Sequence, residues 1–197
     1  MGTRGTLRVY LNDDLKIRQY NQWDSYPTGQ FAAICGFFKS EDNREALVKS
    51  LANGRLCTEE EYEAMEYLDE HGSFPEGWKY KGLVCMLYTL RNRDYGADML
   101  YQAMCLQTTS TERQPMGERV FPDWAMTFDE GGDLAGEEGN YVIELTADGI
   151  DTKDPWRSDP ENIRFRLSGE YHGIEREYDW NVIPAEEDIE AWEEEEE

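Results

Sequence analysis

The amino-acid sequence predicts an α+β protein with an N-terminal β-hairpin, several central helices and further antiparallel strands in its C-terminal half. Short alternating runs open the chain, apolar residues at helical spacing follow, and alternating runs return at residues 141–145 and 163–167. The 197 residues, 13% of them aromatic, are enough to bury one good-sized core. We therefore expect one α+β domain over residues 1–184 and an acidic C-terminal tail over residues 185–197.

The N-terminal hairpin is predicted from residues 6–11 and 15–20. Both runs are rich in alternating, β-branched and aromatic residues, and a short polar turn separates them. Successive side chains of a strand point to opposite faces, so Leu7, Val9 and Leu11 are expected on one side of the sheet. The hairpin should therefore present one apolar face to the core.

Four helices are predicted along the central part of the chain. Apolar residues at helical spacing indicate helices over residues 31–38 and 41–52. Thr58 and Glu61 have the spacing of a capping box, which opens a third helix that Gly72 closes. A fourth helix follows, with the expected inward residues Ala97, Leu100, Tyr101 and Met104.

The second half of the chain is expected to add strands. Residues 141–145 and 163–167 are rich in β-branched and aromatic residues and predict two strands, and residues 120–128 are a third candidate. Residues 130–139 are rich in glycine and acids, which is typical of a flexible loop. From residue 185 the acidic run predicts a solvated tail or a fraying helix.

Residues 20–29 concentrate polar and aromatic side chains where the hairpin gives way to the first helix. Loops on rigid scaffolds often carry binding or catalytic groups. A hydrolase-like enzyme or a small-ligand-binding protein is the function that a pocket at this junction would support. The residues that such a pocket would combine are Arg4, Trp23, Asp24, Ser25, Tyr26, Arg93 and Asp94.

The alternative for this junction is a packed corner, in which Asp24 caps the following helix and the aromatic residues pack against the core. A serine nucleophile needs a base, and neither His71 nor His172 is near Ser25 in the sequence. We favour the packed corner, assign no catalytic residue and expect a protein that is not an enzyme.

No cofactor and no metal site are predicted. The sequence holds two histidines, no Cys-x-x-Cys pair and no glycine-rich phosphate loop between a strand and a helix. Cys35, Cys85 and Cys105 lie in apolar runs, where a free cysteine usually behaves as a small buried hydrophobe, and all four cysteines, Cys57 included, are expected to be reduced, structural thiols. No apolar run approaches the roughly 18 residues that span a bilayer. We expect a cytoplasmic protein.

The net charge of the chain is strongly negative, and the excess of acids lies after residue 57. Forty-three acids against nineteen bases give a formal charge of -24. The first 57 residues hold six acids and eight bases, and the remaining residues hold 37 acids and eleven bases. Nucleic acids and anionic membranes would repel such a chain, whereas a basic protein would attract it. Direct nucleic-acid binding and membrane binding are therefore excluded.

The acidic run begins in the predicted third helix. Carboxylates on a rigid helix, about 5 to 6 Å apart for neighbours in successive turns, can present a field comparable with that of DNA phosphates. We therefore predict that this helix binds a basic, nucleic-acid-handling partner as a DNA mimic. A generic acidic binding module, and acidity that serves solubility or a salty habitat, remain the alternatives. The predicted partner-binding residues are Glu59, Glu60, Glu63, Glu66, Asp69 and Glu70.

Four motifs carry a resemblance to a known group of proteins. They are Thr3-Arg4-Gly5, Tyr20-Asn-x-Trp-Asp-x-Tyr-Pro27, Arg93-Asp94-x-Gly96-Ala97-x-x-Leu100 and Tyr141-Val-Ile-x-Leu145. In this order they resemble a family of phage-encoded and bacterial proteins of unknown function, over most of residues 1–145. The resemblance implies a shared α+β fold and no assigned activity. A phage origin makes small acidic inhibitors of host defences, such as CRISPR-Cas effectors or restriction enzymes, the comparison class, and places the protein in the cytoplasm of an infected bacterium.

Overall fold

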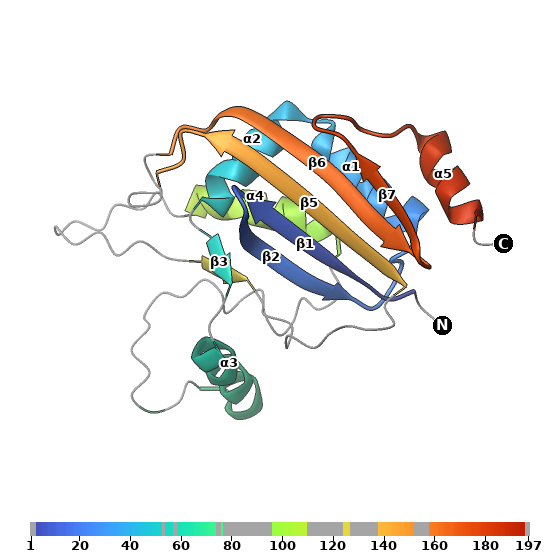
Figure 1. The fold of residues 1–197 in the computed structure, drawn as a ribbon. Coiled ribbons are helices and arrows are strands. Elements are labelled where there is room, and N and C mark those ends of the chain that lie inside the picture. Colours follow the sequence, from blue (N-terminus) through green and yellow to red (C-terminus); the bar gives the residue numbers. More distant parts are fainter. Residues whose placement is uncertain are drawn as a thin grey trace.

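A mixed five-stranded sheet with helices packed against one face forms the centre of the molecule (Figure 1). This arrangement confirms the predicted α+β class, including the N-terminal hairpin and the antiparallel strands of the C-terminal half. The computed structural model describes residues 3–52, 54–56, 59–73, 76, 96–109, 124–126, 138–151 and 158–195.

The sheet joins strands from both ends of the chain in the order β2-β1-β5-β6-β7. β1 pairs in parallel with β5, and the other three pairings are antiparallel. A second, two-stranded sheet pairs β3 with β4 in parallel. The strands are β1 (Gly5–Leu11), β2 (Asp14–Asn21), β3 (Gly54–Leu56), β4 (Trp124–Met126), β5 (Gly139–Asp148), β6 (Glu161–Tyr171) and β7 (Ile174–Tyr178).

The hairpin turn between β1 and β2 is tied to β5. Asn12 and Asp13 both have positive φ, 49° and 67°, as a two-residue turn of type I′ requires. The Asn12 side chain acts like a further strand residue: its Nδ2 donates to the Ala147 carbonyl, and its Oδ1 accepts from the Ala147 amide, both at 3.0 Å. The Asn12 amide also donates to the Leu145 carbonyl at 2.9 Å. These bonds hold the tip of the hairpin against the sheet.

The predicted helices are present with small changes at their ends. Ser40 caps α2 by accepting a hydrogen bond from the Asn43 amide at 3.3 Å. α3 ends at His71 and is followed by Gly72, whose φ of 69° suits glycine and whose amide donates to the Leu68 carbonyl at 2.8 Å. The helical elements are η1, a π-helical turn (Pro27–Phe31), α1 (Ala32–Phe38), α2 (Glu41–Leu51), α3 (Glu59–His71), α4 (Asp98–Thr109) and α5 (Glu186–Glu194).

The core lies between the sheet and helices α1, α2 and α4 (Figure 1). Leu7, Val9 and Leu11 are buried together on one face of β1, as the alternation predicts. Ala97 and Leu100 of α4 are buried as expected, but the inward placement of Tyr101 is wrong because its side chain is 43% exposed. A tyrosine ring can pack by one edge and leave its hydroxyl wet, and Tyr101 packs on Phe37 with ring centroids 4.8 Å apart. Other inward residues of α4 are Met99 and Ala103.

The acidic C-terminal segment contains a docked helix. Over Glu186–Glu194 it is neither the solvated tail nor the fraying helix that its composition predicts, because α5 buries Ile189 and Trp192. Trp192 is fully buried, and its indole N–H donates to the Ile174 carbonyl at 3.2 Å. Its ring meets that of Phe31 edge-on, with centroids 5.3 Å apart. α5 therefore belongs to the core packing.

Gly169 in β6 makes room for Trp192. A Cβ atom at this position would lie 2.7 Å from Trp192 Cη2 and 2.7 Å from Tyr141 Cδ1. Such distances are far inside van der Waals contact, so a glycine is needed where the α5 tryptophan reaches the sheet.

None of the helices within the described ranges combines the length and the apolar character that a membrane-spanning segment needs.

Candidate functional site

The first candidate, the junction at residues 20–29, is closely packed around Ser25. Ser25 is 1% exposed, and its Oγ accepts a hydrogen bond from Asn21 Nδ2 at 2.9 Å. The Ser25 amide donates to the Thr3 carbonyl at 3.2 Å, and the Ser25 carbonyl accepts from the Tyr141 hydroxyl at 2.8 Å. Burial raises the pKa of that tyrosine far above its usual value, which keeps it a donor. Ser25 thus links the junction to the starts of β1 and β5.

Glycines let these three backbones approach closely. A Cβ on Gly5 would lie 1.9 Å from the Gly139 carbonyl oxygen and 2.7 Å from Ser25 Cβ. A Cβ on Gly139 would lie 2.0 Å from the Ser25 carbonyl oxygen. The space around Ser25 is therefore filled by the chain itself, and the Ser25 hydroxyl serves as a structural group.

The other residues proposed for this pocket diverge. Trp23 is 54% exposed, and Arg4 and Asp24 are also exposed. Tyr26 is half-buried and packs against the core. Arg93 and Asp94 lie outside the described residues. The structure therefore brings Ser25 and Tyr26 to the core side of the junction and leaves Arg4, Trp23 and Asp24 at the surface.

The expected cap at Asp24 is wrong, because η1 begins at Pro27 with Tyr26 in the N-cap position, and no side chain of the N-cap makes a capping hydrogen bond. A carboxylate from the far end of the chain takes this place. Glu193 Oε2 in α5 accepts hydrogen bonds from the Thr28 amide at 2.9 Å and from Thr28 Oγ1 at 2.6 Å. A negative group is stabilised at the first turn of a helix, so Glu193 joins α5 to the start of η1.

The second candidate is the acidic helix α3. Glu60, Glu63 and Glu70 are exposed, while Ala64 is buried. Positions 59, 63, 66 and 70 recur at the helical period and share one face. The structure describes the backbone of Glu59, Glu66 and Asp69 within α3 and not their side chains. Figure 1 shows α3 standing away from the five-stranded sheet.

α5 forms a second acidic surface, and the sequence predicted its acids but not their fixed position. Because Trp192 and Ile189 fix the helix to the core, its outward acids have a defined position. One of the acids, Glu195, pairs with Arg176 of β7. The exposed carboxylates within α5 are Glu186, Glu187, Asp188, Glu190 and Glu194.

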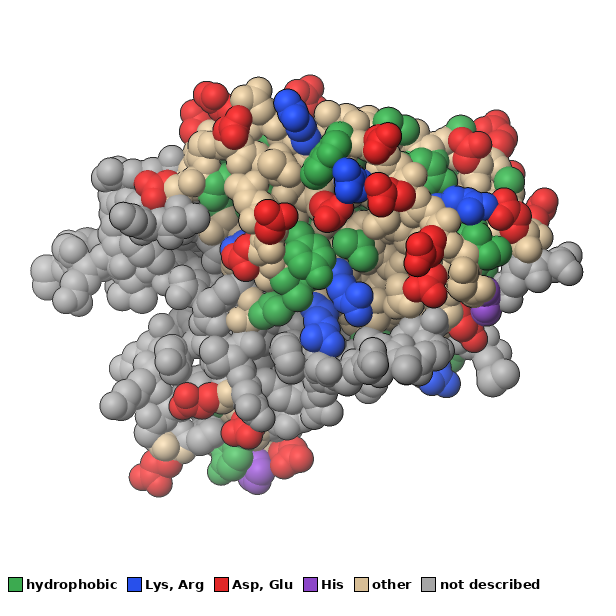
Figure 2. Space-filling view, viewed as in Figure 1, with side chains coloured by type: hydrophobic (Ala, Val, Ile, Leu, Met, Phe, Trp, Pro, Cys, Tyr) green, Lys and Arg blue, Asp and Glu red, His purple; other side chains and the backbone are tan. Residues whose placement is uncertain are grey.

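Further acids lie on the open face of the sheet, the face that the helices leave uncovered. Glu170 of β6 stands directly opposite Glu175 of β7, and Glu177 lies on the same face. Like charges directly opposite each other destabilise a sheet, so the fold accepts a cost here. On β1 and β2 the same face carries Arg8 directly opposite Arg18. Figure 2 shows basic and hydrophobic side chains in the middle of this face and acidic side chains around them.

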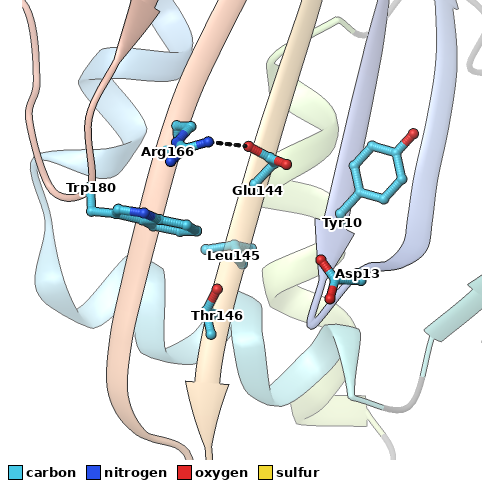
Figure 3. Close-up of a pocket in the computed structure, with 7 residues that line it drawn as sticks. All are labelled: Tyr10, Asp13, Glu144, Leu145, Thr146, Arg166 and Trp180. Carbon is cyan, nitrogen blue, oxygen red and sulfur yellow. Dashed lines mark ion pairs between the residues drawn. The ribbon is translucent and has the colours of Figure 1, made fainter.

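A pocket of about 390 Å³ opens on this face of the sheet (Figure 3). We call it the open-face pocket. β5 forms its floor, the end of β1 and the hairpin turn form one wall, and β6 with the loop after β7 forms the other wall. The residues that line it are Tyr10, Asp13, Glu144, Leu145, Thr146, Arg166 and Trp180.

The wall formed by Trp180 and Arg166 is held by several contacts. The Arg166 guanidinium lies over the Trp180 ring, 4.9 Å from its centroid. Arg166 also pairs with Glu144 at 3.7 Å and with Glu177 at 3.6 Å. Asn181 fixes the loop, since its amide donates to the Phe165 carbonyl at 2.7 Å and its Oδ1 accepts from the Phe165 amide at 3.3 Å. Trp180 is thus held on the sheet while 38% of its surface stays exposed.

Sequence reasoning missed the open-face pocket because its residues come from four separate parts of the chain. Within the described ranges, no group of three or more His, Cys, Asp or Glu side chains is placed to hold a metal ion. Cys35 is buried, and its burial raises the thiol pKa to about 12. Cys57, Cys85 and the side chain of Cys105 lie outside the described residues.

Comparisons of the chain with protein-family models, with curated proteins and with solved structures find no match.

Proposed function

We propose that the protein binds and inhibits a basic, nucleic-acid-handling protein by presenting fixed carboxylates to a groove that normally binds phosphates. The observation that carries this proposal is the docking of α5. Trp192 and Ile189 bury one side of a helix whose exposed residues are mostly acids, so the charges are held on a rigid surface. α3 supplies a second acidic helix, with Glu60, Glu63 and Glu70 exposed.

The electrostatic argument rests on spacing and on rigidity. A DNA duplex carries one negative charge about every 1.7 Å along its axis, and proteins bind it largely through lysine and arginine. Acidic residues in successive turns of a helix, whose Cβ atoms lie about 5 to 6 Å apart, offer such groups a comparable target. Association driven by such fields is fast and weakens as salt rises.

The amount of charge is itself an argument for binding. A net charge of -24 in 197 residues produces electrostatic repulsion within the folded protein, and this repulsion lowers the stability of the fold. The fold also places Glu170 opposite Glu175, which adds a local cost. A basic partner would neutralise both contributions in the complex.

The proposed class of partner is a nucleic-acid-binding defence effector of a bacterial host, such as a CRISPR-Cas effector or a restriction nuclease. The support is the resemblance of the four sequence motifs to phage-encoded proteins, together with the acidic surfaces of α3 and α5. The protein would then act in the cytoplasm of an infected cell. The buried, hydrogen-bonded Ser25 favours no second function at residues 20–29.

Capture of partners from a bacterial host lysate, at low and at high salt, tests the proposal. The wild-type protein should retain a basic nucleic-acid-handling protein at low salt and lose it as salt rises. Replacing Glu59, Glu63, Glu66 and Glu70 of α3 by lysine should abolish capture and inhibition while the circular dichroism of the fold is kept.

A matched control replaces the same number of acids by lysine in the charge-balanced part of the chain. It changes the net charge equally and should keep most of the capture. The proposal is wrong if the α3 variant still inhibits, or if both variants lose the partner to the same extent. The control residues are Asp14, Glu41, Asp42 and Glu45.

A further inference from the structure

We propose that the open-face pocket receives a single lysine or arginine side chain of the basic partner, an inference that rests on the proposed function and names its point of contact. Tyr10 and Trp180 stand on opposite sides of this pocket, and Glu144 lies between them on β5 (Figure 3). Aromatic faces and carboxylates are the groups that bind cationic side chains most strongly.

The charges that line the pocket are negative on balance, which favours the binding of a cation. Arg166 contributes one positive charge, but its guanidinium is already shared by Glu144 and Glu177 and stacked on Trp180. Asp13, on the opposite wall, has an exposed carboxylate at the tip of the hairpin. A cation entering between the walls would meet the Asp13 carboxylate, the Tyr10 ring and the outer side of Glu144.

The same charges argue against a nucleotide or another anion. A phosphate in the pocket would face the carboxylates of Asp13 and Glu144, and the positive charge of Arg166 is offset by its ion pairs with Glu144 and Glu177 at 3.7 and 3.6 Å. The field of a chain with a charge of -24 would repel it further. The pocket volume of about 390 Å³ is also near the lower end for ligand sites, which suits one long side chain.

Both walls of the pocket are positioned before anything binds. Asn12 ties the hairpin tip, and therefore Asp13, to Ala147 of β5. Asn181 ties the Trp180 loop to Phe165 of β6. Rigid, partly exposed aromatic residues in such a setting are typical of the anchor points of protein interfaces, because little conformational freedom is lost on binding.

A titration with isolated side chains tests the pocket without knowledge of the partner. N-acetyl-argininamide and N-acetyl-lysinamide are added to the full-length protein, and the indole N–H signals of its tryptophans are followed by NMR. The Trp180 signal, assigned from a Trp180→Phe variant, should shift with saturation in the roughly millimolar range. The Trp23 signal serves as an internal control, since Trp23 is 54% exposed and does not line the pocket.

Two pairs of variants separate the pocket from the general charge of the surface. Tyr10→Leu should weaken binding about fivefold, whereas Tyr10→Phe, which keeps the ring, should change it less than twofold. Asp13→Asn should weaken binding several-fold and keeps the turn, because asparagine also tolerates positive φ. Asp14→Asn is its control, since Asp14 is exposed, pairs with Lys16 and does not line the pocket.

The inference is overturned if no saturable shift of Trp180 occurs, if Trp23 shifts equally, or if both members of each variant pair behave alike. Equal binding of N-acetylglutamate would also overturn it and would indicate a site for another class of ligand. A different pair of results would contradict the proposed function alone. In that case the side-chain titration would succeed, but no basic protein would be captured from the lysate. Capture that survives Tyr10→Leu in full, despite a successful titration, would contradict the pocket as the point of contact.

Discussion

Replacing Trp192 by alanine should remove a large part of the stability of the fold. The side chain is fully buried and contacts Phe31 and Tyr141, with ring centroids 5.3 and 6.3 Å away. Burial of about 200 Å² of tryptophan surface at about 25 cal/mol per Å² corresponds to about 5 kcal/mol. Measured truncations of buried aromatic residues cost about 3 to 5 kcal/mol, which agrees with this figure.

Urea unfolding, followed by circular dichroism, measures this loss. With a slope of about 2 kcal/mol per molar, the midpoint should fall by about 1.5 to 2.5 M. Trp192→Phe keeps an aromatic ring but removes the N–H that donates to the Ile174 carbonyl, and it should cost about 1 to 2 kcal/mol. Trp23→Ala is the control, because an exposed tryptophan should contribute within about 0.5 kcal/mol.

The reasoning is refuted if Trp192→Ala and Trp23→Ala unfold at the same urea concentration. α5 would then not be docked in solution, and the fixed acidic surface that supports the proposed function would be lost with it. Should Trp192→Ala fail to fold, the milder Trp192→Phe still measures the contact. Its midpoint must then lie below that of the wild type.

Three further predictions concern single residues. Gly169→Ala should lower the free energy of unfolding, measured by thermal unfolding, by about 1 to 3 kcal/mol, because its Cβ would lie 2.7 Å from Trp192. Its control is Gly36→Ala in α1, where a Cβ would have nothing within 4 Å, and this variant should stabilise the protein by up to about 1 kcal/mol. Glu193→Ala should cost about 1 kcal/mol through loss of the two Thr28 hydrogen bonds, and the exposed neighbour variant Glu194→Ala should be nearly neutral. Cys35 should resist thiol reagents at pH 8 until the protein unfolds, because its pKa is raised to about 12. The unfolded thiol ionises first, so stability should fall as pH rises from about 9 to about 12, and Cys35→Ala should make that fall shallower.

The hairpin and α3 could be predicted because their determinants are local. The period-two alternation of Leu7, Val9 and Leu11 selects the buried face of β1 without knowledge of the rest of the chain. Gly72 likewise ends α3 through its own positive φ. Such signals depend on residues a few positions apart, which a sequence displays directly.

The parallel pairing of β1 with β5 could not be predicted in the same way. Leu7 pairs with Tyr141, and the contact between them depends on how the intervening chain folds. The open-face pocket has the same origin, because Tyr10, Glu144, Arg166 and Trp180 become neighbours only when the sheet has assembled. No spacing in the sequence encodes that proximity.

The docking of α5 was missed for a different physical reason. Its acids dominate the composition, while two apolar residues, Ile189 and Trp192, decide whether the helix docks. They are three positions apart and therefore share one helical face. A large aromatic residue at that spacing is the signal that could have predicted a docked helix within an acidic run.

The docking of α5 changes what its acids can contribute to binding. Ordering a mobile segment costs about 1 kcal/mol or more for each residue, so fixing the nine residues of α5 at an interface would cost on the order of 10 kcal/mol. In the folded protein this cost is met by the burial of Trp192 and Ile189 before a partner arrives. Carboxylates such as Glu187, Glu190 and Glu194 can then attract a basic groove without a further ordering penalty. In an electrostatic inhibitor, acids on a docked helix therefore contribute more to binding affinity than a longer run of mobile acids.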